Sequence, residues 1–486
     1  MNWGRNVKPS LIDRITVLSM FVFSPIFVLL FYVVNYGNYN KSFGMFFYSV
    51  YLGDYESIIE SLPSFELGVF AWCVYWIIFQ LALAALPDCI HYILKCYRGG
   101  TQTGQLTPGS HVLIYNINGL QAWCITHAIF LMGYYVGNIN PMAIIEKWGQ
   151  ILFSMVIISY SLAFLVYIKA LFFSSHPKDN KITGHFIYDF VMGVEFNPRV
   201  MGIDLKLFFN GRPGIIGWTL INLIFMIAQY ENFGYVTNSM ILVNILQLIY
   251  VLDFFWNETW YLNTIDIAHD HFGWMLAFGD CVWLPFMYTL QAGYLMNVPV
   301  VLDQAYCITI LVLGIFGYVI FRTANYQKDQ FRKGCVIDAA KNDPSDLEYG
   351  KVKTDYAIGD KAVSIGETNR KSFSKNNHTK SNYIGCNYLV KSNTSSKHCY
   401  QESRLLISGL WGYARKMNYT GDIIIAACFC LACGFEHILP YFYSIYLTIL
   451  LVNRCYRDEH RCKNKYGDDW DKYCRLVKYR LVPYVF

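Results

Sequence analysis

Apolar stretches as long as a membrane-crossing helix recur along the whole chain. They include residues 15–34, 70–86, 152–173 and 300–321, and a helix needs about 20 apolar residues to cross about 30 Å of hydrocarbon. The 486 residues are 55% hydrophobic and 15% charged, whereas roughly 25% charge is usual in soluble domains. This balance excludes a soluble globular protein and predicts an all-α, multi-pass membrane protein.

About ten spans are predicted. They lie at residues 15–34, 66–87, 121–138, 150–173, 213–230, 237–256, 274–297, 300–321, 421–436 and 438–453. Arg5, Lys8 and Arg14 precede the first span, which predicts a cytosolic N-terminus. An even number of crossings returns the C-terminus to the cytosol. Pro440 divides the last long apolar run, because proline cannot donate the helical hydrogen bond, and a helical hairpin is expected there.

The segment 333–403 differs in composition from the rest of the chain. It is rich in Lys, Ser, Asn and Asp and has no helical or strand periodicity, which predicts a largely disordered cytosolic loop. The chain is therefore divided into a transmembrane bundle at 1–322 and a C-terminal half at 323–332 and 404–486.

The densest group of ionisable residues in an apolar region runs from Asp253 to His271. Such residues are costly in a membrane, so the group predicts a polar cavity, with a structural hydrogen-bond network as the alternative for each single residue. In a helix, Glu258 and Tyr261 would share a face, as would Asp266 and Asp270. His269 and His271 are two residues apart, which is unsuitable for a helical zinc pair.

Three further groups lie toward the C-terminus. Lys328 and Arg332 are four residues apart and would grip a phosphate together, and the stretch 406–422 offers aromatic and amide groups to a flat ring. The tail 453–486 holds nine Lys or Arg and five Asp or Glu. These patterns suit a polyanionic cofactor, but also a juxtamembrane basic segment with an interfacial aromatic belt.

Other partners are not expected. Cys428, Cys430 and Cys433 lie in an apolar span without histidines at ligand spacing, so packing is preferred to metal binding. A short basic tail beside so many spans does not favour nucleic acid. No Gly-x-Gly-x-x-Gly turn follows a strand, so a dinucleotide would be bound outside a Rossmann fold.

Two long patterns resemble the membrane sterol reductases, a family that includes the C14, C7 and C24(28) sterol reductases and the lamin B receptor. The first runs from Gly184 to Arg199, with Phe196 where many members have Leu. The second comprises Arg457-Asp458, Lys465-Tyr466-Gly467, Asp469-Trp470 and Tyr473. Residues 118–127, 207–214 and 253–260 are most similar to the C7 reductases. The resemblance covers about residue 85 to the C-terminus, apart from 333–403.

The resemblance implies NADPH-dependent reduction of the C7=C8 double bond of a sterol in sterol biosynthesis. It further implies ten helices in the endoplasmic reticulum membrane, sterol entry from the bilayer and a cytosol-facing cofactor pocket. Membrane lipids and the sterol are the expected partners, and the oligomeric state is left open. By matching positions, the residues implied to contact NADPH are Lys328, Arg332, Leu406, Trp411, Asn418, Tyr419, Asp458, Cys462, Lys463, Asn464, Lys465, Tyr466 and Tyr473.

Hydride addition to an alkene requires that an acid protonate one carbon first. Tyr261 or Asp458 is the expected donor, with Glu258 and Asp266 orienting it. A C14 sterol reductase is the nearest alternative. An isoprenylcysteine methyltransferase and a non-catalytic sterol-binding protein are more distant ones, and a transporter is disfavoured because inverted repeats are absent.

Overall fold

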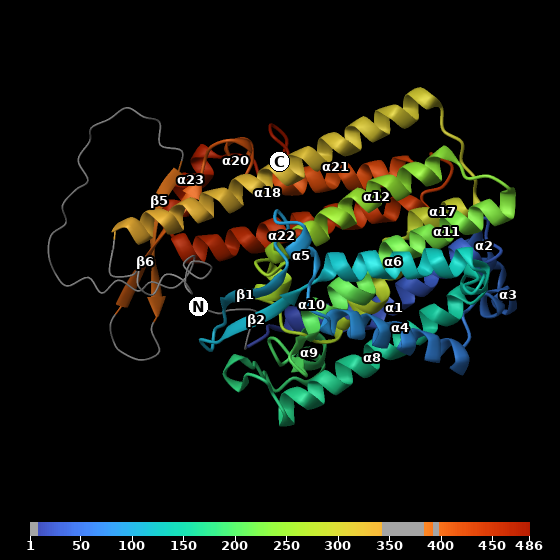
Figure 1. Ribbon diagram of the computed structural model, residues 1–486, viewed down its shortest axis with the longest axis horizontal. Coiled ribbons are helices and arrows are strands. Elements are labelled where there is room, and N and C mark those ends of the chain that lie inside the picture. Colours follow the sequence, from blue (N-terminus) through green and yellow to red (C-terminus); the bar gives the residue numbers. More distant parts are fainter. Residues whose placement is uncertain (1–7, 343–382, 392–397) are drawn as a thin grey trace. The chain divides into compact units, whose positions relative to one another are not determined.

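The chain folds into two compact units, both mainly helical (Figure 1). The computed structural model describes residues 8–342, 383–391 and 398–486, with side chains at 8–331 and 405–486. The N-terminal unit comprises Asn2–Leu311 and Phe429–Tyr443, and the C-terminal unit comprises Val312–Cys428 and Ser444–Phe486. The predicted helical class of membrane protein is confirmed, whereas the functional division at residue 322 stays a prediction.

The N-terminal unit holds most of the helices. In chain order these are α1 (Leu11–Tyr36), α2 (Phe43–Leu52), α3 (Tyr55–Glu60), α4 (Leu67–Ala85), α5 (Ile90–Ile93), α6 (Gly119–Tyr135), α7 (Pro141–Glu146), α8 (Trp148–Phe172), α9 (Phe186–Met192), α10 (Leu205–Phe209), α11 (Gly217–Phe233), α12 (Asn238–Trp256), α13 (Glu258–Tyr261), α14 (Ile265–Ala268), α15 (Trp274–Phe278), α16 (Leu284–Met287) and α17 (Leu290–Asn297). Two segments are π-helical, η2 (Asn210–Ile216) and η3 (Gly279–Trp283). Single 3₁₀ turns are η1 (Pro177–Asp179) and η5 (Leu439–Tyr441).

Helix α18 (Gln304–Asn342) begins in the N-terminal unit and continues into the C-terminal unit. The other elements of the C-terminal unit are β5 (Tyr383–Lys391), β6 (His398–Leu406), α20 (Leu410–Tyr413), α21 (Met417–Leu431), α22 (Phe442–Tyr466) and α23 (Asp468–Leu476). Gly317 of α18 and Gly421 of α21 let these two helices meet backbone to backbone, since a Cβ on Gly421 would lie 2.5 Å from the Phe321 nitrogen. This contact places the middle of α18 alongside the first half of α21.

Six helical stretches are long and apolar enough to cross a membrane. They are Leu11–Tyr36, Leu67–Ile93, Trp148–Phe172, Leu205–Phe233, Asn238–Trp256 and Gln304–Phe331. The first, α1, begins with a capping box at its N-terminus. The Asp13 backbone N–H donates to Ser10 Oγ at 3.1 Å, and the Ser10 N–H donates to Asp13 Oδ2 at 2.8 Å. Its 26 residues correspond to about 39 Å, so the helix is long enough to span hydrocarbon.

Three of the remaining predicted spans are shorter or interrupted, and the fourth, 438–453, falls on η5 and the first part of α22. Helix α6 has 17 residues and α21 has 15. The stretch predicted as one span at 274–297 is divided among α15, η3, α16 and α17. Pro285 accounts for part of this division, because it lacks the N–H for a continuing helical ladder. The total of ten crossings therefore stays a prediction.

Aromatic rings fill the interior of the N-terminal unit where α1, α8, α9 and α15 meet. Phe21 lies 4.9 Å from Trp274 and 6.0 Å from Phe190 between ring centroids, and Trp274 is stacked on Phe278 at 4.8 Å. Gly193, at the end of α9, has a positive φ of 82°, and a Cβ there would lie 2.4 Å from the backbone of Phe272. The glycine of the first family pattern thus permits close contact with the segment before α15.

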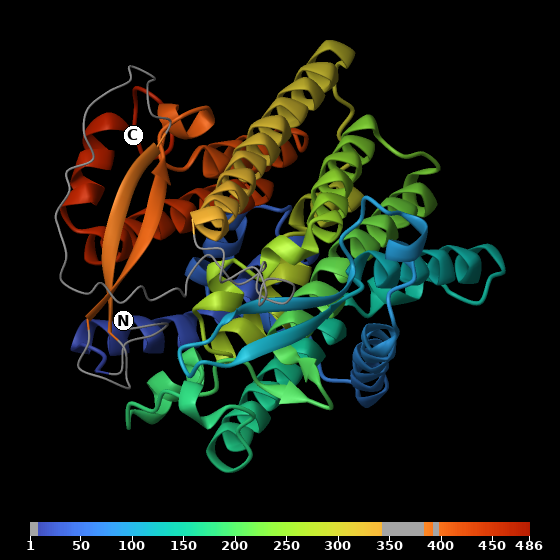
Figure 2. The same cartoon turned by 60° about the vertical axis from the view of Figure 1, so that its left-hand side comes forward.

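Three antiparallel hairpins join the described helices, although the sequence predicts no strands. They pair β1 (Gly100–Leu106) with β2 (Val112–Ile117), β3 (Arg199–Val200) with β4 (Ile203–Asp204), and β5 with β6. The β5–β6 ribbon runs beside α23 (Figure 2), and its register pairs Tyr383 with Leu406 and Lys391 with His398. Within 333–403 the chain therefore forms the end of α18 and most of this hairpin, whereas residues 343–382 and 392–397 lie outside the described residues.

Candidate functional site

The predicted site residues fall into two clusters, one in each unit. Glu258, Tyr261 and Asp266 belong to the N-terminal unit, and Asp458 belongs to the C-terminal unit with the predicted cofactor residues.

Glu258 lies at the start of α13, and both of its carboxylate oxygens accept hydrogen bonds, one in an ion pair and one from a backbone N–H. Arg212 Nη1 of η2 donates to Glu258 Oε1 at 2.7 Å, and the Gly119 N–H at the start of α6 donates to Oε2 at 2.9 Å. The side chains of Arg212 and Glu258 are 2% and 0% exposed. A carboxylate at a helix N-terminus is also favoured by the helix dipole. This arrangement joins α6, η2 and α13 through one buried ion pair.

Asn118 and Gly119 complete this network. Arg212 Nη2 donates to Asn118 Oδ1 at 2.9 Å, while Asn118 Nδ2 donates to the Leu86 carbonyl at 2.7 Å beyond the end of α4. A Cβ on Gly119 would lie 2.5 Å from both Arg212 Nη1 and Glu258 Oε2. Only glycine therefore fits beside the ion pair at this position. The sequence identifies Glu258 but gives no role to Arg212.

Tyr261 ends α13, three residues after Glu258, so the helical spacing expected for this pair is present. Its ring lies 5.4 Å from that of Phe254 and packs against a buried cluster that includes Tyr115 and Leu262. The spacing expected for Asp266 and Asp270 is not helical, because α14 ends at Ala268. Asp266 lies in α14 and Asp270 lies after its end, so the two carboxyl groups do not share a helical face.

Lys206 of α10 fixes the C-terminal end of α14, the short helix that carries Asp266. Its buried Nζ donates to the carbonyls of Ile267 at 2.7 Å and Asp270 at 2.8 Å. The ammonium also lies 4.2 Å from the ring centroid of Phe196, the position at which the first family pattern departs from its usual Leu. A cation over an aromatic face is a favourable contact, so Phe196 supports the buried charge.

Asp458 of α22 is the centre of the C-terminal cluster. Lys416, just before α21, donates to Asp458 Oδ2, and Arg461 Nη2 donates to Oδ1 at 2.5 Å. Burial of the carboxyl would raise its pKa, but the positive charges of Lys416, Arg461 and Lys328 outweigh this and hold the pKa of Asp458 well below its usual range. Asp458 is therefore a carboxylate held by three nearby cations.

Trp411 of α20 and Asn418 of α21 lie against α18. Trp411 is buried, its indole N–H donates to the Ala324 carbonyl at 2.8 Å, and Lys328 Nζ lies 4.9 Å from a ring centroid of the indole. Asn418 Nδ2 donates to Asn325 Oδ1 at 3.2 Å. Asn418 Oδ1 is buried and has no hydrogen-bond partner among the described residues. An indole face, a nearby ammonium and an unused amide acceptor are thus collected along one side of α18.

The other predicted cofactor residues lie around the Asp458 ion pairs and around Trp411. Leu406 packs against the Trp411 cluster, and Lys416 Nζ lies 5.9 Å from the ring centroid of Tyr419. Cys462, Tyr466 and Tyr473 pack together around Trp470, and burial raises the pKa of Tyr473 to about 12.

The remaining predicted positions contribute less to this arrangement. Lys463 pairs with Asp471, Lys465 Nζ lies 5.1 Å from the ring centroid of Tyr466, and Asn464 is exposed. The side chain of Arg332 lies outside the described residues, so the expected pairing of Lys328 with Arg332 stays a prediction.

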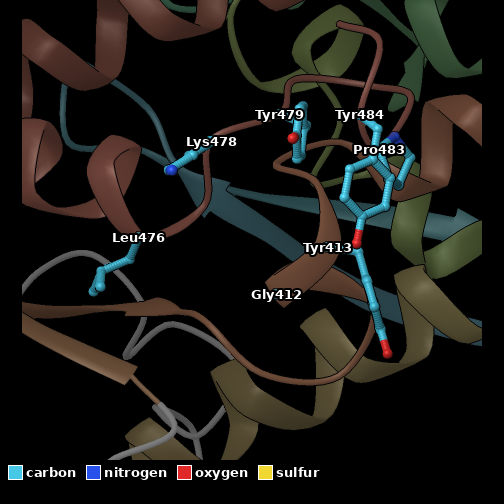
Figure 3. A pocket seen from close by; sticks show the side chains of 7 residues that line it. All are labelled: Gly412, Tyr413, Leu476, Lys478, Tyr479, Pro483 and Tyr484. Atoms are coloured by element: carbon cyan, nitrogen blue, oxygen red, sulfur yellow. The ribbon is translucent and has the colours of Figure 1, made fainter.

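A surface pocket lies beside this cluster in the C-terminal unit (Figure 3). Its volume is about 140 Å³, and the residues that line it are Gly412, Tyr413, Leu476, Lys478, Tyr479, Pro483 and Tyr484. The tyrosine rings lie on one side and Lys478 on the other (Figure 3). None of the predicted cofactor residues lines this pocket.

Several charged residues in apolar stretches were not predicted as site residues. These are Lys206, Arg212 and Asp280 of the N-terminal unit and Lys416 of the C-terminal unit. The cost of burying a charge in a membrane protein is the signal that would have identified the first three. Most of the predicted site residues were inferred from the resemblance to family sequence patterns. Such a pattern does not show which distant residue a side chain will bond in the fold.

Comparison with known proteins agrees with the sequence patterns. Residues 12–486 match the family described as "Ergosterol biosynthesis ERG4/ERG24 family". The chain is 50% identical over 485 residues to a "Probable 7-dehydrocholesterol reductase" of Acanthamoeba polyphaga mimivirus, covering 100% of this chain and 98% of that protein. It is 43% identical over 492 residues to "7-dehydrocholesterol reductase" of Danio rerio, covering 100% and 94%. It is 36% identical over 431 residues to "Delta(14)-sterol reductase LBR" of Gallus gallus, covering 87% and 57%.

Proposed function

The chain belongs to the ergosterol biosynthesis ERG4/ERG24 family, and from this premise we propose that it reduces the C7=C8 double bond of 7-dehydrosterols with NADPH. The observation that carries the choice of bond is full-length similarity, at 43% identity or more, to proteins named 7-dehydrocholesterol reductase. The similarity to a Δ14-sterol reductase is lower and covers less of the chain. Reduction of a C14 double bond is therefore the second candidate.

The C-terminal cluster suits a phosphate-bearing dinucleotide. Lys328, Lys416 and Arg461 bring three positive charges around the single carboxylate of Asp458, and cations with hydrogen-bond donors are the groups that bind phosphates. Trp411 offers an aromatic face to a flat ring. The buried Asn418 Oδ1 has no partner among the described residues and would accept a hydrogen bond from an amide N–H of the cofactor.

Within the proposed reaction, reduced nicotinamide supplies the hydride. The protein must supply a proton to C8, which places positive charge at C7, shared with C5 through the neighbouring double bond of a 5,7-diene. A dry, preorganised site is needed so that water does not capture this cation. The ion pairs of Asp458 support a role in holding the cofactor rather than in donating the proton, because an ionised carboxylate has no proton to give.

We further propose that the protein resides in the endoplasmic reticulum membrane with both termini in the cytosol. A cytosolic C-terminal unit would have direct access to soluble NADPH. The basic residues that precede α1 support this orientation through the positive-inside rule. Attaching a protease site to each terminus and testing cleavage in sealed microsomes would check this topology.

The test of the reaction is loss of diene absorbance by the full chain in membranes. We expect a 5,7-diene sterol to be consumed with NADPH and more slowly with NADH, and an 8,14-diene to be left intact. Consumption of the 8,14-diene alone would support the second candidate. Failure to consume either diene, with folded protein present, would refute sterol reduction by this chain.

A further inference from the structure

Asp280 is a buried acid that the mechanism above does not use. It lies on the π-helical segment η3 and is 7% exposed. Asn210, the first residue of the π-helical segment η2, donates from Nδ2 to Asp280 Oδ1 at 3.1 Å. The two segments are closely packed, since a Cβ on Gly214 of η2 would lie 3.1 Å from the Asp280 carbonyl oxygen. π-Helical turns are rare and often occur at functional sites, and two face each other here.

The surroundings of Asp280 differ from those of Glu258 and Asp458, the buried carboxyl groups of the two clusters described above. Glu258 is paired with Arg212, and Asp458 with Lys416 and Arg461. The hydrogen-bond partner of Asp280 is instead the neutral amide of Asn210. An unpaired carboxylate in an apolar interior is costly, so such a group keeps its proton.

We propose that Asp280 is the acid that protonates the sterol double bond. This inference rests on the proposed function. The O–H bond of Asp280 breaks, its proton and the π electrons of the C7=C8 bond form a new C8–H bond, and the carboxylate remains. The cation at C7 is then neutralised by a hydride from a reduced nicotinamide. Asp280 regains a proton from water after the product leaves.

Acid strength favours Asp280 over the tyrosine that the sequence suggested. The ordinary pKa of a carboxyl is about 4, whereas that of a phenol is about 10. Carbon is a poor proton acceptor, so the stronger acid is the better donor, provided that its site holds the proton until the substrate arrives. Burial beside a neutral amide provides this condition.

Asn210 acts as a positioning residue for this acid. Its amide N–H engages Asp280 Oδ1, so the acidic proton is placed on Oδ2. Asn210 Oδ1 is buried and has no hydrogen-bond partner among the described residues. The neutral amide thus orients the carboxyl group. A cation in its place would instead stabilise the ionised carboxylate.

The decisive variant is Asp280→Asn in the full chain, purified into lipid nanodiscs. We expect turnover of a 5,7-diene sterol to fall at least about 100-fold, in line with the contribution of a general acid. Affinities for the sterol and for NADPH should stay within threefold of wild type. Asp303→Asn is the matched control, because Asp303 is exposed and caps the start of α18, a role that asparagine also fills.

Turnover of Asp280→Asn within threefold of the wild type would overturn the proposal. If that variant does not fold, Asp280→Glu and Asp280→Gln provide the same comparison between an acid and an amide of equal size. The acid should be at least tenfold faster, and equal rates would again overturn the proposal. A wild-type protein that consumes no diene would instead refute the proposed function itself, so the two failures are distinguishable.

Discussion

The Glu258 and Asp458 clusters both contain a buried carboxylate paired with a basic side chain, but they differ in completeness. Around Glu258, both carboxylate oxygens are bonded, and Arg212 also donates to Asn118. Around Asp458, three cations lie near the carboxylate, and the side chain of Arg461 remains 50% exposed. A fully buried, closed network is typical of a structural element, whereas a partly exposed cluster around a carboxylate with a strongly shifted pKa is typical of a ligand site.

The largest expected effect comes from breaking the closed network. Arg212→Met leaves Glu258 buried without its cation, which should destabilise the fold by about 3–5 kcal/mol. Thermal unfolding in nanodiscs would measure this loss. The double variant Arg212→Met, Glu258→Met should recover part of it, because no charge is then left buried. Wild-type stability in the single variant would contradict a structural role for this cluster.

A smaller effect is expected where the network is open. Lys328→Ala should weaken NADPH affinity by tenfold to about 100-fold, as loss of a charged hydrogen bond of about 1.5–3 kcal/mol predicts. Folding and the rate at saturating NADPH should change little, and Arg332→Ala should behave alike. Lys472→Ala is the matched control, since that exposed lysine pairs with Asp469 on α23. Unchanged NADPH affinity in Lys328→Ala would remove this residue from the cofactor site.

The dependence of stability on pH should show that Asp458 is ionised in the folded protein. Its folded-state pKa is depressed by Lys416, Arg461 and Lys328 despite burial, so its contribution to stability is fully present above the unfolded value of about 4. That contribution is lost as pH falls below about 4 toward the folded-state pKa. The stability difference between wild type and Asp458→Asn, measured by thermal unfolding, should be constant from pH 7 to 5 and shrink below pH 4. A difference that grew on acidification would contradict the ionised state.

The smallest effect is expected at Tyr261. Because its ring packs against the cluster of Tyr115 and Leu262, Tyr261→Phe preserves the packing and removes only the hydroxyl. Turnover should fall by less than tenfold, with both substrate affinities near wild type, if Asp280 is the proton donor. A loss of 100-fold or more would instead assign the proton to Tyr261.

The sequence predicted the helical membrane class and the positions of the long apolar helices well. The thickness of the bilayer sets the length of an apolar stretch that crosses it, and this length can be read directly from the sequence. It did not predict how 274–297 is interrupted, since π-helical turns have no simple periodic signal. It likewise predicted Glu258 as a polar group but not its bond to Arg212, 46 residues earlier. Partners distant in sequence are set by packing, which no local pattern records. The positive charge around Asp458 was visible in the tail, but the contribution of Lys416 required the fold.

Isotope labelling tests the central claim, sterol reduction by protonation and hydride transfer, most directly. The purified full chain would be given 7-dehydrocholesterol with NADPH that carries deuterium at its reactive carbon, and the product examined by NMR. Protonation at C8 and hydride transfer to C7 predict cholesterol with deuterium at C7, and deuterium at C8 when the reaction with ordinary NADPH is run in D₂O. Absence of product, or label at any other carbon, would contradict this claim.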